Sequence, residues 1–116
     1  MSRYYEELAA YDRGGMLVVV DKTYEDLHPR DCFDDSVTDI SELCDKIERG
    51  VYDWFMLRVR VMLDGHELAT EYLGGMLYEN PSECLTDGTA EDVIDVAMVS
   101  ARQEIVRLKD RLASFA

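Results

Sequence analysis

Residues 55–65 read Phe-Met-Leu-Arg-Val-Arg-Val-Met-Leu-Asp-Gly, and this stretch decides the fold. From Phe55 to Leu63 an apolar residue occupies every odd position, and Met or Arg occupies each position between. A period of two residues predicts a β-strand with one buried face. Asp64-Gly65 is a strong two-residue turn signal. We therefore expect a β-hairpin, with strands over about 52–63 and 66–73.

The turn also sets a register for the hairpin. It pairs Leu63 with His66 and, on the opposite face, places Arg58 across from Glu71, an opposite-charge pair that supports the alignment. Gly74-Gly75 then lie across from the start of the first strand. Glycines there leave room for an aromatic ring or mark a β-bulge.

Three further segments precede the hairpin. Residues 3–12 have apolar side chains at helical spacing and end at Gly14-Gly15, which predicts a short helix. Residues 16–20 read Met-Leu-Val-Val-Val and predict a strand buried on both faces. Asp39 is a suitable N-cap for a helix over about 40–49.

A long C-terminal helix completes the predicted fold. Thr89, followed by Asp92 three residues later, predicts its start. Apolar positions then recur at alternating intervals of four and three residues, a heptad stripe. At 1.5 Å per residue the helix would be roughly 39 Å long. The stripe comprises Ile94, Met98, Ala101, Ile105, Leu108, Leu112 and Phe115.

These elements predict a single α+β domain over residues 1–116. We expect a three-stranded mixed or antiparallel sheet with the long helix packed on one face. The stripe has two interpretations. It packs on the domain's own sheet, or its end forms a homodimer seam, because the helix is longer than a small sheet. The seam would comprise Ile105, Leu108, Leu112 and Phe115.

Composition indicates which partners the protein could have. The 116 residues include 25 acidic and 12 basic residues, for a net charge of −13. Such a field repels nucleic acid and anionic membranes and attracts basic protein surfaces.

There is no apolar run near 18 residues, and the first residues lack the apolar core of a signal peptide. Three widely spaced cysteines indicate reduced thiols, so we expect a cytoplasmic protein.

Acidic residues are concentrated in two segments. Residues 21–45 hold nine acids against two bases, a net of −7, and residues 79–95 hold six acids and no base. The acids either form a solvated, solubilising surface or bind basic protein by imitating nucleic-acid phosphates, whose charge density is comparable. The candidate partner-binding residues are the loop trio Asp31, Asp34 and Asp35 and the helix trio Glu91, Asp92 and Asp95. If neither trio binds, the hairpin face of Trp54, Met56, Arg58 and Arg60 is the alternative.

Catalytic motifs are not visible in the sequence. There is no phosphate-binding glycine loop and no G-x-S-x-G elbow. The group around His28 and Cys32 lacks zinc spacing, and it also lacks the central glycine of a calcium loop. We predict no catalytic residue, metal or cofactor. A small enzyme or ligand carrier remains a third hypothesis, after a binding protein and a homodimer.

One resemblance bears on function. The stretches Trp54-Phe55-Met56-Leu57-Arg58-Val59 and Leu73-Gly74-Gly75-Met76-Leu77-Tyr78 look like phage-type reading frames. Size, acidity and α+β organisation make the whole chain resemble the anti-CRISPR and anti-restriction inhibitors of phages and mobile elements. The resemblance implies a non-enzymatic DNA mimic in the host cytoplasm, whose acids occupy a basic nucleic-acid channel of a defence complex. It assigns no site residue. The alternative is a homodimeric structural or regulatory protein.

Overall fold

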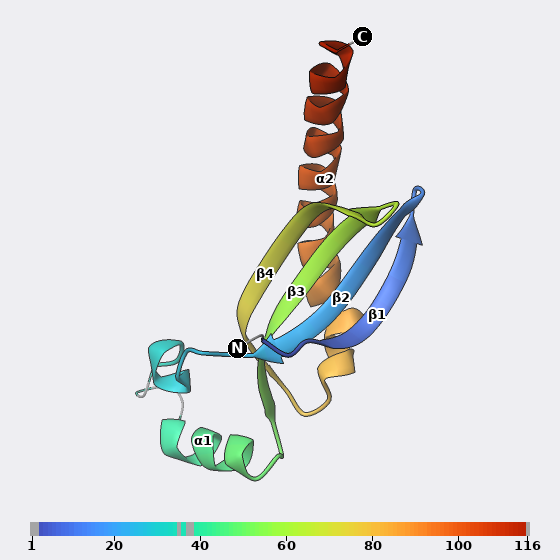
Figure 1. The fold of residues 1–116 in the computed structure, drawn as a ribbon. Helices are drawn as coiled ribbons and strands as arrows, with labels where there is room; N and C mark the ends of the chain where they lie inside the picture. The colour runs from blue at the N-terminus through green and yellow to red at the C-terminus, as the bar shows by residue number, and fades with distance from the viewer. Residues whose placement is uncertain (1–2, 35, 37–38, 116) are drawn as a thin grey trace.

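The chain builds one antiparallel sheet, with the strands in sequence order, and carries a long helix on one face (Figure 1). The computed structural model describes residues 3–34, 36 and 39–115. The elements are β1 (Glu6–Arg13), β2 (Met16–Tyr24), the 3-10 helix η1 (Pro29–Asp31), α1 (Ile40–Glu48), β3 (Asp53–Leu63), β4 (His66–Tyr78), the 3-10 helix η2 (Pro81–Leu85) and α2 (Thr89–Ala113).

The N-terminal segment is a strand, so the helix predicted over residues 3–12 is wrong. Strand β1 pairs antiparallel with β2 from Glu6 to Arg13. Gly14 and Gly15 have φ values of +60° and +85° and form the turn between these strands. Left-handed φ at both central residues is what a tight hairpin turn requires. The sheet therefore has four strands rather than three, and all are antiparallel.

The predicted β3–β4 hairpin is confirmed, but its register is not. Leu63 pairs with His66, as predicted. The register then shifts between Met62 and Val61, because β4 contains one extra residue there. As a result Arg58 lies opposite Tyr72, and the predicted pairing of Arg58 with Glu71 is wrong. The second strand also continues to Tyr78, beyond the predicted end at residue 73.

A second irregularity lies at the two adjacent glycines. Phe55 pairs with Met76 and Leu57 with Leu73, so Gly74-Gly75 together face one residue of β3. Gly75 has a φ of +68°, and a Cβ built there would lie 3.6 Å from Cη2 of Trp54. The glycines mark a bulge, one of the two alternatives that the sequence left open, and bring the chain close to the tryptophan ring.

The main core lies between the sheet and α2, as the prediction of a helix on one face required. The side chains that fill it are fully or nearly fully buried. They include Val18, Val20, Phe55, Leu57, Val59 and Val61 from the sheet and Ile94, Ala97, Met98 and Ala101 from the helix. Strand β2 is also buried on its other face, at Val19 and Asp21, which agrees with its predicted two-sided burial.

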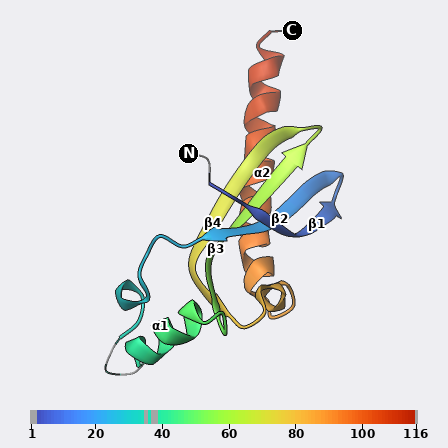
Figure 2. The ribbon, with the colours of Figure 1, turned by 60° about the horizontal axis from the view of Figure 1, so that its bottom comes forward.

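The helix starts were predicted with mixed success. Oδ1 of Asp39 accepts a hydrogen bond from the Glu42 N–H at 3.1 Å, the N-cap predicted for α1. Helix α2 has Gly88 as its N-cap residue, not Thr89. The side chain that caps this end of the helix belongs to Asp87, whose Oδ1 accepts a hydrogen bond from the Thr89 N–H at 2.9 Å. Figure 2 shows α1 and η1 together beyond one end of the sheet.

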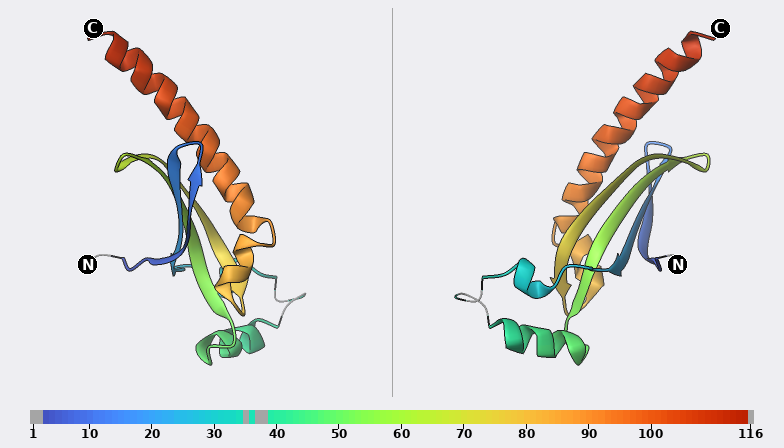
Figure 3. Two further views of the ribbon diagram at one scale, coloured as in Figure 1. Left: turned by 90° about the vertical axis from the view of Figure 1, so that its right-hand side faces the viewer. Right: turned by 60° about the vertical axis from the view of Figure 1, so that its left-hand side comes forward.

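The C-terminal half of α2 extends past the sheet (Figure 3). Ala101 is its last buried residue, and Leu112 and Phe115 are 66% and 76% exposed. The molecule is correspondingly elongated, with extents of 61 × 31 × 23 Å. Despite its length, α2 is too polar to span a membrane, and no other described helix meets that requirement.

Candidate functional site

Two residues of the loop trio are described: Asp31 ends η1, and Asp34 lies in the turn that follows it. Oδ2 of Asp31 accepts the His28 N–H at 3.2 Å and so caps η1. Oδ1 of Asp34 accepts both the backbone N–H and the hydroxyl of Ser36, at 2.9 and 2.8 Å. These two bonds hold the pKa of Asp34 below its usual value. Asp35 lies outside the described residues. Asp31 and Asp34 therefore stay exposed while also fixing the local turn.

The helix trio at the start of α2 is divided by an ion pair. Glu91 binds the Arg13 guanidinium through both carboxylate oxygens, at 2.7 and 3.3 Å. This contact lowers the pKa of Glu91. Asp92 and Asp95 are exposed and form no ion pair with any described residue. Only part of the trio therefore presents free charge.

The two trios lie on different parts of the molecule. The segment that carries Asp31 and Asp34 is beside α1, beyond the end of the sheet, whereas the helix trio is on α2 behind the sheet (Figures 1 and 2). A partner that contacts both must therefore extend around the end of the sheet.

One acid of the acidic segment 21–45 is buried in the fold. Asp21 is 2% exposed and accepts hydrogen bonds from Nε and Nη2 of Arg58, at 2.8 and 2.7 Å. Nη2 of Arg60 lies 3.4 Å from the same carboxylate. The Arg58 guanidinium also stacks on the Tyr5 ring, 3.4 Å from its centroid. The hairpin face considered as an alternative binding surface therefore has both guanidiniums engaged internally.

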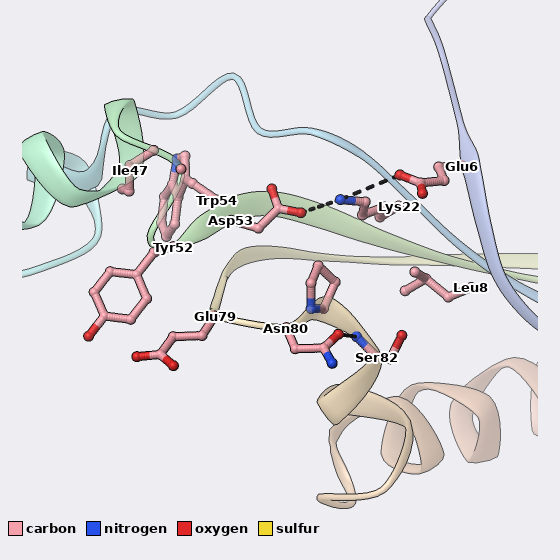
Figure 4. Close-up of a pocket in the computed structure, with 12 residues that line it drawn as sticks. Glu6, Leu8, Lys22, Ile47, Tyr52, Asp53, Trp54, Glu79, Asn80 and Ser82 are labelled. Atoms are coloured by element: carbon pink, nitrogen blue, oxygen red, sulfur yellow. Dashed lines mark hydrogen bonds and ion pairs between the residues drawn. The ribbon is translucent and has the colours of Figure 1, made fainter.

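A cleft of about 520 Å³ opens where α1, the start of β3 and η2 meet (Figure 4). Tyr52 and Trp54 contribute aromatic rings, and Glu6, Asp53 and Glu79 contribute carboxylates. The Trp54 ring is held in place because its Nε1–H donates to the Leu27 carbonyl at 2.9 Å. The cleft therefore combines a fixed indole ring and a tyrosine ring with excess negative charge.

Lys22 is the base within this lining. Its ammonium binds Asp53 and lies 3.5 Å from Glu6 (Figure 4). Burial lowers the pKa of Lys22, but the hydrogen bond to Asp53 and the nearby carboxylates raise it by more. The net effect is a raised pKa. One ammonium against three carboxylates leaves the cleft acidic. Such a lining suits a guanidinium or ammonium group, which also binds aromatic faces.

Sequence reasoning missed this cleft, because its residues come from β1, β2, α1, β3 and η2. One signal was available, since Trp54 belongs to the hairpin face considered as an alternative. The ring of Tyr52 already accepts a cation, because the Lys46 ammonium lies 5.7 Å from its centroid.

Of the cysteines, one is buried in the core and another lies beside a histidine. Cys84 is fully buried, and burial raises its thiol pKa to about 11. Cys44 Sγ lies 3.9 Å from Nε2 of His28. Within the described part of the chain, no three His, Cys, Asp or Glu side chains are placed to hold a metal ion.

We compared the chain with models of protein families, with curated proteins and with solved structures, and found no match in any of the three comparisons.

Proposed function

We propose that this protein is a non-enzymatic inhibitor that binds the basic nucleic-acid-binding surface of a host defence complex, in the manner of an anti-CRISPR protein. It would act in the host cytoplasm by competing with DNA or RNA. The observation that supports this most strongly is the distribution of charge. Most bases form ion pairs within the chain, whereas a set of acids at the surface forms none with the described residues.

Seven bases in or next to the sheet and α1 form ion pairs with carboxylates of the same chain. Each of seven lies within 4.0 Å of a carboxylate oxygen. They are Arg3, Arg13, Lys22, Lys46, Arg49, Arg58 and Arg60. Most positive charge outside the end of α2 is therefore neutralised locally.

A set of acids has no such partner. Glu79, Glu83, Asp92 and Asp95 are exposed and make no ion pair with the described residues. A surface with surplus negative charge attracts and orients a basic partner before contact.

The acidic cleft supports the same function. Interfaces draw most of their affinity from a few anchors that fill pockets, and arginine is prominent among them. An arginine or lysine of the partner could enter between Glu79 and the rings of Tyr52 and Trp54. This cleft extends the predicted binding surface beyond the two acidic trios.

The direct test is displacement of DNA. Purified CRISPR effector complexes and restriction endonucleases would be incubated with labelled target DNA and increasing amounts of the protein. We expect at least one complex to lose its DNA, while the protein alone binds none. If no complex in the panel loses DNA with the protein at tens of micromolar, the proposal is wrong.

A second candidate function is that of a homodimeric structural or regulatory protein. The exposed apolar end of α2 favours it, because Leu112 and Phe115 continue the stripe that packs on the sheet. The two candidates use different surfaces and can be tested separately.

A further inference from the structure

The side of α2 that points away from the sheet carries exposed valines. Val96, Val99 and Val106 are 54%, 52% and 59% exposed. At about 100° per residue they lie roughly 140–160° around the helix from Ala101, which is buried against the sheet. Figure 3 shows this outward side of α2 facing away from the sheet. The three valines therefore belong neither to the core nor to the predicted seam, which continues the core-facing stripe.

These valines belong to a second stripe with heptad spacing. We define the outward stripe as the residues that follow one another at alternating intervals of four and three, namely Asp92, Val96, Val99, Gln103, Val106, Asp110 and Ala113. This spacing keeps a line of side chains facing a second helix. Valine is a poor residue for an exposed helix position, because its branched Cβ restricts the side chain there. Three exposed valines on one such line therefore indicate a surface that another helix covers.

Charge along the outward stripe changes sign at the middle of the helix. The charged residues on the stripe, or at the heptad positions that flank it, are Asp92, Asp95, Arg102, Arg107, Lys109 and Asp110. The two in the N-terminal half give −2, and the four in the C-terminal half give +2. Parallel helices would bring like charges together. Antiparallel helices place each acidic half against a basic half and set the helix dipoles in opposite directions. The charges therefore fit a second copy of α2 that runs in the opposite direction.

We propose that two copies of this chain form an antiparallel dimer through the outward stripe of α2. The helix comprises Thr89–Ala113, so two copies that overlap along their whole length have their midpoints together at Ala101. In that register Val96 faces Val106 of the second copy, and Asp95 lies across the seam from its Lys109. Two-fold symmetry makes the interface isologous, so each contact occurs twice. Each sheet lies on the far side of its own helix, so the sheets do not collide.

The polar residues of the outward stripe lie at its middle and its ends. Gln103 faces Val99 of the second copy, and a polar residue within a seam specifies the register at a cost in stability. Asp92 and Asp110 are exposed residues at the ends of the stripe, and Lys109 of the second copy lies beside them. The valines in between therefore form the apolar part of the interface.

This inference rests on the homodimer candidate and moves its interface to another face of α2. The test is sedimentation equilibrium of the full chain at about 5–100 micromolar. Val99→Glu and Val106→Glu each place a carboxylate in the stripe, and symmetry removes two apolar contacts at once. We expect a wild-type dimer and about a hundredfold weaker dimerisation for each variant. Leu112→Glu is the control and should stay dimeric, because Leu112 is 66% exposed on the core-facing side of the same helix.

Circular dichroism should show all three variants folded. Val106 lies beyond Ala101, the last buried residue of the helix, so Val106→Glu decides the result if Val99→Glu does not fold.

The direction of the two helices has a separate test, in about 0.05 M salt so that screening is weak. Asp95→Lys sets like charges against each other at both Asp95–Lys109 contacts, so it should weaken the dimer by about tenfold. Adding Lys109→Asp restores opposite charges and should recover most of the wild-type affinity. In a parallel dimer each residue lies beside its own counterpart, so the second change would not compensate for the first.

Three results would overturn the inference. A wild type that is monomeric at about 100 micromolar removes both this dimer and the homodimer candidate. A monomeric Leu112→Glu with dimeric Val99→Glu and Val106→Glu would place the interface at the predicted seam, so the homodimer would stand and the outward stripe would not. A doubly charge-reversed variant that stays weakened would exclude the antiparallel arrangement. The DNA-displacement test is independent of these results, because Val99→Glu keeps every acid of both trios.

Discussion

At the scale of single residues, Asp21 shows what composition cannot reveal. It was counted with the acidic segment of residues 21–45 because it is the first of the nine acids in that range. The β2–β3 register instead places it opposite Arg58, where it is buried beneath two guanidiniums. Its partner is therefore determined by strand pairing and not by local sequence. Asp39, by contrast, was correctly predicted as an N-cap, because a cap is a local interaction within a few residues.

Asp21→Asn should destabilise the fold, because it leaves Arg58 partly buried without a counter-charge. Removing one partner of a buried pair costs about 3–5 kcal/mol. We expect a loss near the lower end in urea-induced unfolding, because the Arg58 side chain is still 14% exposed. The control is Asp26→Asn, which breaks the Arg3 pair at a side chain that is 63% exposed and should cost no more than about 1 kcal/mol. Equal losses in the two variants would contradict this account of Asp21.

Cys84 should be unreactive in the folded protein. Burial raises its pKa to about 11, so the thiol remains protonated at pH 8, and Ellman's reagent should label the exposed Cys32 first. In the unfolded chain the thiol ionises near its ordinary pKa of 9.0, so its contribution to stability is complete below pH 9 and declines as the pH rises towards 11. Rapid labelling of Cys84 under native conditions would show that it is not buried.

At the scale of elements, the sequence predicted the strands and helices whose apolar residues recur at a regular spacing. The β3–β4 hairpin, α1 and α2 follow from such patterns. Residues 3–12 did not, because Tyr4, Leu8 and Tyr11 fit helical spacing although the segment is a half-buried edge strand with weak alternation. The β3–β4 register failed for a related reason, since a single extra residue in β4 is invisible to a count from the turn.

Gly15 offers a test of the β1–β2 turn. Its φ of +85° is strained for a residue with a β-branched side chain, so Gly15→Val should lower the free energy of unfolding by about 1–3 kcal/mol. Gly15→Asn should cost less, because asparagine tolerates left-handed backbone better. No neighbouring atom lies within 4 Å of a Cβ at this position, so conformation rather than crowding would cause the difference. Equal effects of Val and Asn on the melting temperature would argue against this turn geometry.

At the scale of the whole molecule, charge distribution is the property that bears on function. The net charge of −13 was evident from sequence, but its division between internal pairs and free surface was not. Glu91 belonged to a candidate trio and is paired with Arg13, whereas Glu79 belonged to neither trio and lines the acidic cleft. Such differences depend on which distant segments meet, and the sequence patterns do not specify that.

Neutralising exposed acids of the two trios should leave the overall fold intact and weaken binding. Asp92→Asn with Asp95→Asn removes two exposed charges, at a modest cost to the helix start, where acids favour the helix dipole. Asp31→Asn with Asp34→Asn is the companion variant at the loop trio. Either change should slow association with the partner complex. If binding ignores both, the acidic trios are solvated surface.

The most direct measurement is the association rate of the protein with a captured defence complex, followed as salt is raised from 0.05 to 0.5 M. Exposed charges are screened over about 10 Å at 0.1 M. We predict that the rate falls steeply with salt. We also predict that a Glu79→Gln, Asp92→Asn, Asp95→Asn variant shows a lower rate and a shallower salt dependence than the wild type. A rate that is independent of salt and unchanged in this variant would contradict binding through an acidic surface.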